Sequence, residues 1–299
     1  MRLLTTCMTV LAIAQWTGVL LPNSVAAQPT SGPAAVRFRT INDIEYQNVE
    51  PSEHADIYLP THAARTPPVP AVIWMHGDHH DKADDRERNI CSQLADAGYI
   101  AISINYGSWP DSDVGEEHSP RILQNIANAR SAILYFRAHA ADYGIDPAHI
   151  ALFGGSAGAW LALMVGLTDA NAPFDSSNPY PGVSSAVSVI GDFYGDLDPW
   201  LKSTITSKSP SVLTAKSPPV LIVHGKADPA VDYHDSLALS QTLADFRVPN
   251  ELILLDNVGH GFDFTTWQNK PLPQDLRPVV LEFLRKYLGS PVSGLSKQN

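Results

Sequence analysis

The chain has 299 residues, of which 44% are hydrophobic and 17% are charged. This length and composition suffice for a sizeable core and exclude a fibrous or intrinsically disordered class. The net charge of −11 disfavours nucleic acids and anionic membranes as partners, because both carry negative charge themselves.

The first 27 residues have the features of a secretory signal peptide. Arg2 gives the positive start, an apolar stretch follows, and small residues end the segment at Ala27. An uncleaved membrane anchor is the alternative, but the apolar stretch is short and Gln15 interrupts it. We therefore expect a secreted or periplasmic protein that has no membrane attachment after cleavage at 1–27.

Residues 28–35 are rich in Pro, Ser and Ala, and they predict a flexible leader. The fold is expected to begin near Val36 and to occupy residues 36–299 as one domain, either as a monomer or as a homodimer. Once the signal is removed, Cys91 is the one remaining cysteine, so no intramolecular disulfide can form. We expect Cys91 to behave as a small buried hydrophobic residue.

Short apolar runs alternate with helical patterns along the rest of the chain. Six runs are too short for helices, and they predict strands at 71–75, 100–104, 150–153, 187–190, 220–223 and 252–255. Apolar residues at spacings of three and four predict a helix after Pro120, and other helices are expected at about 85–97, 157–168, 233–246 and 275–288. This repetition predicts an α/β fold with parallel strands buried on both faces.

A G-x-S-x-G pattern stands where one of these strands ends and the next helix begins. Gly154 and Gly158 let the strand and the helix approach each other, while the hydroxyl of Ser156 points outward from a strained turn. The helix that starts at Ala157 offers a backbone N–H and the positive end of its dipole to an oxyanion. The pattern alone is weak because Gly and Ser are common in loops, but its strand–turn–helix context indicates a nucleophilic serine.

Serine requires a nearby base to accept its proton. His260 lies between two glycines after the last predicted strand, and it is the last histidine of the chain, as the order Ser, acid, His requires. Asp228 follows the preceding strand and is the candidate acid that fixes the imidazole tautomer. Asp232 and Asp256 are the alternatives, although Asp232 is expected to cap the next helix and Asp256 stands directly at a strand end.

The loop after the strand at 71–75 is the expected second side of an oxyanion hole. Gly77 or Asp78 would donate its backbone N–H there, together with Ala157. An ionised Asp78 that points inward would oppose an oxyanion. We therefore expect its side chain to turn outward and to accept hydrogen bonds from its own loop.

Three residues near this edge of the sheet are candidates for contact with a substrate. They are His76, Gly155 and Trp109, although Trp109 is nearly as consistent with an aromatic residue that covers the core. A metal site is the alternative for the side chains of His76, Asp78, His79, His80, Asp81, Asp84 and Asp85. These residues lack a clear ligand spacing, so a solvated acidic surface is the favoured interpretation and no metal is expected.

Taken in order, these patterns resemble the α/β-hydrolase superfamily, and within it the small exported carboxylesterases related to bacterial feruloyl and acetylxylan esterases and to hormone-sensitive-lipase-like esterases. The resemblance covers most of the chain and rests on Ala55-Asp-Ile-Tyr-Leu-Pro60, Val72-Ile-Trp-Met-His-Gly77, Ile104-Asn-Tyr106, Asp146-Pro-Ala-His-Ile150, Gly154–Gly158, Asp192-Phe-Tyr-Gly195, His224-Gly-Lys-Ala-Asp228 and Gly259-His-Gly261. It implies a mostly parallel, twisted sheet of about eight strands with helices on both faces. Little or no cap is expected, because only 196–217 offers an insertion.

Carried over by position, the resemblance implies that Ser156 is the nucleophile, His260 the base and Asp228 the acid, with the Gly77 loop as oxyanion donor. The sequence differs from the pattern at Asp78 and at Ala159, where many relatives carry glycine. The implied activity is that of a serine carboxylesterase that works through an acyl-enzyme and needs no cofactor.

The expected substrates are small-molecule or polysaccharide-linked esters outside the cell, such as the acetyl or feruloyl esters of plant polysaccharide. One alternative is a serine peptidase similar to prolyl oligopeptidase, although such enzymes usually carry a large gating domain. The other alternative is a hydrolase-fold binding protein without catalysis, which Asp78 leaves open.

Overall fold

The structure is a computed structural model that describes residues 37–47, 53–61, 68–107, 120–168, 179–207 and 212–291. All of them belong to one compact unit, Val36–Asn299. The predicted signal peptide (1–27) and leader (28–35) lie outside the described residues and stay predictions.

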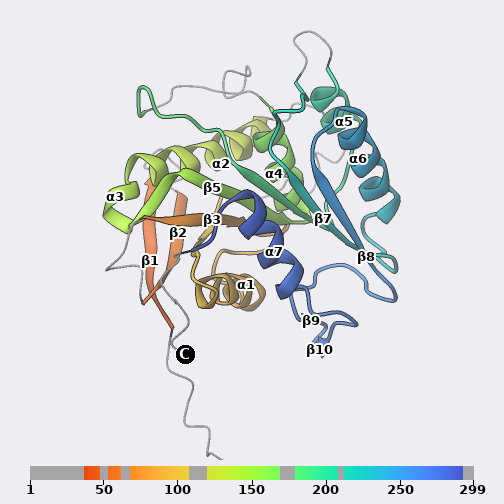
Figure 1. Cartoon of the computed structure of the whole chain (residues 1–299), viewed down its shortest axis with the longest axis horizontal. Coiled ribbons are helices and arrows are strands. Elements are labelled where there is room, and N and C mark those ends of the chain that lie inside the picture. The colour runs from red at the N-terminus through yellow and green to blue at the C-terminus, as the bar shows by residue number, and fades with distance from the viewer. Residues whose placement is uncertain are drawn as a thin grey trace, which may run out of the picture. The chain divides into compact units, whose positions relative to one another are not determined.

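An eight-stranded sheet runs through this unit in the order β1-β2-β4-β3-β5-β6-β7-β8 (Figure 1). The strands are β1 (Phe38–Gln47), β2 (Glu53–Pro60), β3 (Val69–Met75), β4 (Ile100–Ile104), β5 (Ile145–Gly155), β6 (Val189–Phe193), β7 (Val220–Gly225) and β8 (Asn250–Leu255). β2 pairs antiparallel with β1 and β4, and the pairs from β4 through β8 are parallel. The predicted α/β-hydrolase architecture, with about eight mostly parallel strands, is thereby confirmed.

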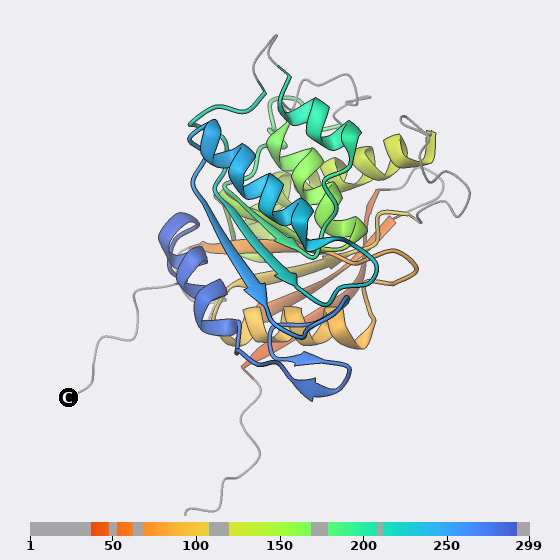
Figure 2. The same cartoon turned by 90° about the vertical axis from the view of Figure 1, so that its right-hand side faces the viewer.

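Helices cover both faces of the sheet, as Figures 1 and 2 show. One face packs against α1 (Asp85–Asp96) and α7 (Arg277–Tyr287), and the other against α2 (Pro120–Ala138), α4 (Ala157–Leu167), α5 (Pro199–Ile205) and α6 (Tyr233–Asp245). Two short elements complete the described fold, namely α3 (Ala140–Tyr143) and the hairpin of β9 (Thr266–Trp267) and β10 (Lys270–Pro271). Among the described residues, no helix has both the length and the apolarity needed to cross a bilayer.

The core is divided by the sheet. Within β3, Ile73 packs with the helices of one face and Trp74 with those of the other, and all seven residues of the strand are buried. A strand covered on both sides becomes continuously apolar, which is why the interior strands were recognisable from sequence. Cys91 lies in the part of the core that α1 and α7 cover and has no exposed surface, as predicted.

Several elements differ from the sequence-based expectation, and β5 (Ile145–Gly155) extends beyond the predicted 150–153 at both ends. The strand predicted at 187–190 begins instead at Val189 and continues to Phe193. The prediction ended too early because the strand contains the polar Asp192, which interrupts the apolar pattern. α5 lies inside the segment 196–217, where only an insertion was expected, and the Asp198 side chain caps it by accepting a hydrogen bond from the Leu201 N–H at 2.6 Å.

Parallel strands end at a common edge of the sheet, and that edge positions the candidate site. The loops that follow β3, β5, β7 and β8 carry Gly77, Ser156, Asp228 and His260 respectively. The topology therefore brings together residues that lie far apart in the sequence.

Candidate active site

Ser156 occupies the sharp turn between β5 and α4. Its φ is 55°, in the left-handed region that residues with a side chain rarely adopt, and its N–H donates to the Phe193 carbonyl at 2.9 Å. A Cβ at Gly154 would lie 2.3 Å from the Gly158 oxygen, and a Cβ at Gly158 would lie 2.3 Å from the Met75 oxygen. The predicted strained turn with obligatory glycines on both sides is confirmed.

The three residues chosen as nucleophile, base and acid lie in one hydrogen-bonded row. His260 Nε2 is 2.9 Å from Ser156 Oγ, and His260 Nδ1 is 2.7 Å from Asp228 Oδ2. The His260 side chain is 25% exposed, whereas the Asp228 side chain has no exposed surface. In this geometry the Nδ1–H donates to the carboxylate, which leaves the Nε2 lone pair to accept the serine proton.

The environment of Asp228 keeps its carboxylate ionised. Burial alone would raise its pKa, but hydrogen bonds from His224, His260 and the backbone N–H groups of Ala230 and Val231 outweigh burial and hold the pKa of Asp228 well below its usual range. The two N–H groups lie 2.8 and 3.0 Å from Oδ1. A permanent negative charge thus faces His260.

The alternative acids are engaged elsewhere. Asp232 caps α6, where its Oδ1 accepts from the His234 N–H at 3.0 Å, as the sequence predicts. Asp256 forms a surface ion pair with Lys226 at 2.7 Å, and its side chain is 73% exposed. Of the three aspartates considered, the structure brings Asp228 to His260.

Backbone segments that carry candidate oxyanion donors meet at Ser156. A Cβ at Gly77 would lie 3.4 Å from Ser156 Cβ, so the loop after β3 packs directly against the nucleophile turn. Ala157 is the first residue of α4, and the leading N–H groups of a helix have no partner within it. Asp78 Oδ1 accepts from the His79 N–H at 2.9 Å, which confirms that this carboxylate bonds within its own loop.

The candidate substrate contacts have different surroundings. His76 is only 4% exposed, its ring stacks on Tyr106 at 4.5 Å, and the Tyr106 hydroxyl donates to the His76 carbonyl at 2.8 Å, so His76 supports the loop from the interior. Gly155 is buried, and a Cβ there would lie 2.5 Å from the Tyr194 hydroxyl. Trp109 lies outside the described residues.

Sequence reasoning missed two neighbours of the row. Tyr194 is 1% exposed and packs edge-on against the His260 ring, with centroids 4.9 Å apart, and His224 contacts Asp228 from within β7. Both belong to segments on which the resemblance rests, and both stand at the carboxyl ends of strands. That position was the available signal for them.

Two residues of the group considered for a metal site, His80 and Asp84, lie together with Glu87, which was not in that group. His80, Asp84 and Glu87 each place one potential ligand atom within 4.8 Å of the others. His80 Nδ1 is hydrogen-bonded to Asp84 at 2.7 Å, and Arg86 is paired with Glu87 at 3.0 Å. Asp84 and Glu87 stand at the N-terminus of α1, where the positive end of the helix dipole opposes a bound cation.

Comparison with known proteins identifies a family and several related esterases. The BD-FAE family model matches residues 55–211. Esterase LipQ of Mycobacterium tuberculosis is 30% identical over 223 residues, which cover 65% of this chain and 49% of that protein. The probable carboxylic ester hydrolase LipM of the same organism is 30% identical over 52% of this chain and 34% of its own length. The chain spans about half the length, or less, of these curated relatives.

Solved structures share the fold. The apo form of Thermogutta terrifontis esterase 2 has a TM-score of 0.66 at 24% identity and covers 85% of this chain and 96% of its own. A truncated form of a carbohydrate esterase from gut microbiota has a TM-score of 0.65 at 22% identity, over 85% of this chain and 98% of its own. At these identities the likeness extends to the fold alone.

Proposed function

The chain belongs to the BD-FAE family, and we propose that it hydrolyses carboxylic esters with Ser156 as the nucleophile. The observation that carries this proposal is the row Ser156–His260–Asp228, with contacts of 2.9 and 2.7 Å, at a strained strand-to-helix turn. The curated relatives described as an esterase and a probable carboxylic ester hydrolase support it.

The reaction proceeds through an acyl-enzyme. Ser156 Oγ attacks the ester carbonyl carbon while its proton passes to His260 Nε2, and the resulting oxyanion is held by the N–H of Ala157 and that of Gly77 or Asp78. When the tetrahedral intermediate collapses, His260 returns the proton to the leaving alcohol. Water then repeats the sequence, attacks the acyl group and releases the acid, while Asp228 stabilises the imidazolium in both halves.

We extend the proposal to the substrate and the place of action. We propose acetyl or feruloyl esters of plant polysaccharide as substrates. Two observations support this choice: a carbohydrate esterase shares the fold, and residues 1–27 of this chain are predicted to be a signal peptide. An exported enzyme would meet such polymers in the periplasm or the medium.

Hydrolysis of short-chain p-nitrophenyl esters by the wild type and by Ser156→Ala tests the proposal. We expect turnover by the wild type and a loss of several orders of magnitude in the variant. Ser188→Ala is a matched control, because the Ser188 hydroxyl donates to the Ala148 carbonyl at the amino ends of the strands. If the wild type is folded and as inert as Ser156→Ala, the proposal is wrong.

Further substrates refine or overturn the assignment. An acyl-chain series, methyl ferulate and acetylated xylan rank the acyl and alcohol groups. If a peptide anilide is cleaved faster than any of these esters, the peptidase alternative replaces the proposal.

A further inference from the structure

A second histidine, His224, contacts the same carboxylate oxygen of the candidate acid as His260 does. His224 lies on β7 and has no exposed surface. Its Nδ1 is 2.7 Å from Ser236 Oγ on α6, and its Nε2 is 3.2 Å from the Val231 carbonyl oxygen and 3.4 Å from Asp228 Oδ2. Nothing in the ester-hydrolysis steps above uses this residue.

The partners of His224 fix the position of its proton. The Val231 carbonyl and the ionised Asp228 only accept hydrogen bonds, so Nε2 must carry a hydrogen in either protonation state of the ring. In the neutral ring Nδ1 then holds a lone pair, which accepts the Ser236 hydroxyl proton. The Ser236 hydroxyl thereby stabilises the tautomer that carries its hydrogen on Nε2.

We propose that His224 is a positioning residue for catalysis, whose Nε2–H is shared between the Val231 carbonyl and Asp228 Oδ2 and so holds the acid in register with His260. This inference rests on the proposed role of Asp228 in ester hydrolysis. Asp228 Oδ2 lies between two imidazoles, and its Oδ1 accepts two backbone N–H groups.

The anchoring of His224 explains why the fold would need it. Asp228 stands on a loop whose neighbours Lys226, Ala227, Pro229 and Ala230 are exposed. His224 belongs to a fully buried strand, and Ser236 belongs to the helix that packs against that strand. His224 and Ser236 thus restrict the movement of the Asp228 carboxylate, because both are held by core elements while Asp228 lies on a surface loop.

The electrostatic surroundings set the direction of a pH effect. The titratable groups that interact with His224 are carboxylates, namely Asp192 from β6, Asp228 from the loop after β7, and Asp232 at the start of α6. Without the His224 N–H, the negative charge of Asp228 is stabilised by fewer donors and therefore interacts more strongly with the His260 imidazolium. Protonated His260 is then favoured, and activity requires a higher pH to appear.

Variants at position 224 test the proposal through the pH dependence of p-nitrophenyl acetate hydrolysis. His224→Phe keeps a planar ring but places C–H where Nε2–H stood, whereas His224→Gln keeps a donor at that position. We expect His224→Phe to lower kcat about tenfold with little change in KM, since a hydrogen bond to a charged group is lost. The acidic limb of its profile should move to higher pH, and His224→Gln should restore most of both properties.

Three results separate the possible failures. If His224→Phe and His224→Gln lose stability equally and both keep the wild-type pH profile, His224 only packs and the inference is wrong. If the wild type itself does not hydrolyse the ester, the proposed function fails instead. If His224→Phe does not fold, Ser236→Ala takes its place, and it should shift the acidic limb in the same direction by a smaller amount. An unshifted profile in folded Ser236→Ala contradicts the inference.

His149→Phe is the matched control for these experiments. His149 is also hydrogen-bonded to an aspartate, Asp146 at 2.8 Å, but it lies at the far end of β5 and is 47% exposed. Its replacement should leave kcat and the pH profile unchanged. If His149→Phe shifts the profile as much as His224→Phe, the shift does not report on Asp228.

Discussion

Tyr194 connects the loops that carry Ser156 and His260. Its hydroxyl donates to the Phe262 carbonyl at 3.1 Å, its ring packs against His260, and it fills the space that the missing side chain of Gly155 leaves. With its own φ at 48°, Tyr194 takes a conformation that a bulky residue adopts only when its surroundings hold it there.

Tyr194→Phe is predicted to loosen the His260 loop. The Phe262 carbonyl would remain buried without its donor, so unfolding free energy should fall by about 1 kcal/mol and kcat several-fold. Urea denaturation and ester kinetics measure the two effects. Tyr143→Phe, which removes a hydroxyl contact with Tyr135 far from the site, should lower stability without changing kcat. Equal kinetic effects of the two variants would contradict a role for Tyr194 in placing His260.

Asp78→Asn is predicted to have little effect on ester hydrolysis. The Asp78 carboxylate accepts from the His79 N–H and pairs with the His79 ring at 3.2 Å, so its charge is directed into its own loop. An asparagine retains the acceptor, and kcat should change less than about threefold, which corresponds to less than 1 kcal/mol. An increase of tenfold or more would mean that the carboxylate opposes the oxyanion in the wild type.

The sequence identified the residues that chain order and glycines mark, and it missed those that act by contact. Ser156 and His260 each lie between glycines next to a strand end, which leaves a local signal. Tyr194 contacts His260 and Phe262 in another loop, and His224 is held by Ser236 on a neighbouring helix, so their strand-end positions alone do not reveal these contacts. Trp109, named from the sequence, lies outside the described residues.

At the level of elements, the interior strands and long helices were predictable because burial produces regular patterns. β1 and the short hairpin are different: β1 is mostly exposed or half-buried, and β9 and β10 have two residues each. α5 has seven residues, too few for a helical period to stand out. α5 packs against α4, and this tertiary contact cannot be read from the local sequence.

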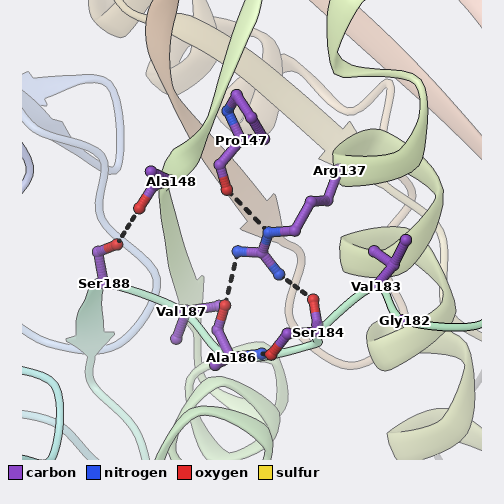
Figure 3. A pocket seen from close by; sticks show the side chains of 9 residues that line it. All are labelled: Arg137, Pro147, Ala148, Gly182, Val183, Ser184, Ala186, Val187 and Ser188. Carbon is purple, nitrogen blue, oxygen red and sulfur yellow. Dashed lines mark hydrogen bonds between the residues drawn. The ribbon is translucent and has the colours of Figure 1, made fainter.

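Arg137, near the end of α2, donates hydrogen bonds both to β5 at the amino end of the sheet and to the loop that precedes β6. Figure 3 shows its guanidinium directed at three backbone carbonyls, those of Pro147, Ser184 and Ala186. These groups border a cavity of about 500 Å³. Pro147 and Ser156 belong to opposite ends of β5, so this cavity lies at the edge of the sheet away from the candidate active site.

Arg137→Lys is predicted to weaken the fold without affecting catalysis. A lysine ammonium cannot reach three carbonyls in the planar arrangement of a guanidinium, and we expect a loss of about 1–2 kcal/mol in unfolding free energy. Thermal or urea unfolding measures the loss, and ester kinetics should match the wild type. Arg88→Lys, in an exposed pair with Asp85, should cost much less. A drop in kcat for Arg137→Lys would show that the two ends of β5 are coupled.

The whole molecule combines a high negative charge with buried carboxyl groups. Burial raises the pKa of Glu53 to about 7 and that of Asp192 to about 6, and burial together with the neighbouring Asp235 raises the pKa of Asp196. Each group binds its proton more tightly in the folded than in the unfolded chain. Their contribution to stability is therefore complete below their unfolded pKa values and is lost as pH rises through the folded ones.

Burial also lowers the pKa of His76, so its contribution rises as pH rises toward the unfolded value, but the three carboxyl groups outweigh one imidazole. We therefore predict that the wild type loses stability between pH 5 and pH 8. Asp228 cannot offset this loss, because a group with a lowered pKa contributes fully throughout that range and loses its contribution only in stronger acid. The net charge of −11 adds repulsion in the same direction. Urea denaturation at the two pH values measures the trend, and equal stability at both would contradict it.

Glu53→Gln isolates one of these contributions. The glutamine keeps an oxygen for the Asn128 side-chain N–H, which lies 3.3 Å from Glu53 Oε1, but it carries no charge to desolvate. At pH 8 the variant should be more stable than the wild type by about 2 kcal/mol, and at pH 5 the difference should largely vanish, because Glu53 is then protonated. Glu45→Gln, at an exposed position on β1, should show no such dependence. If Glu53→Gln gains the same stability at both pH values, its gain comes from packing and not from the buried charge.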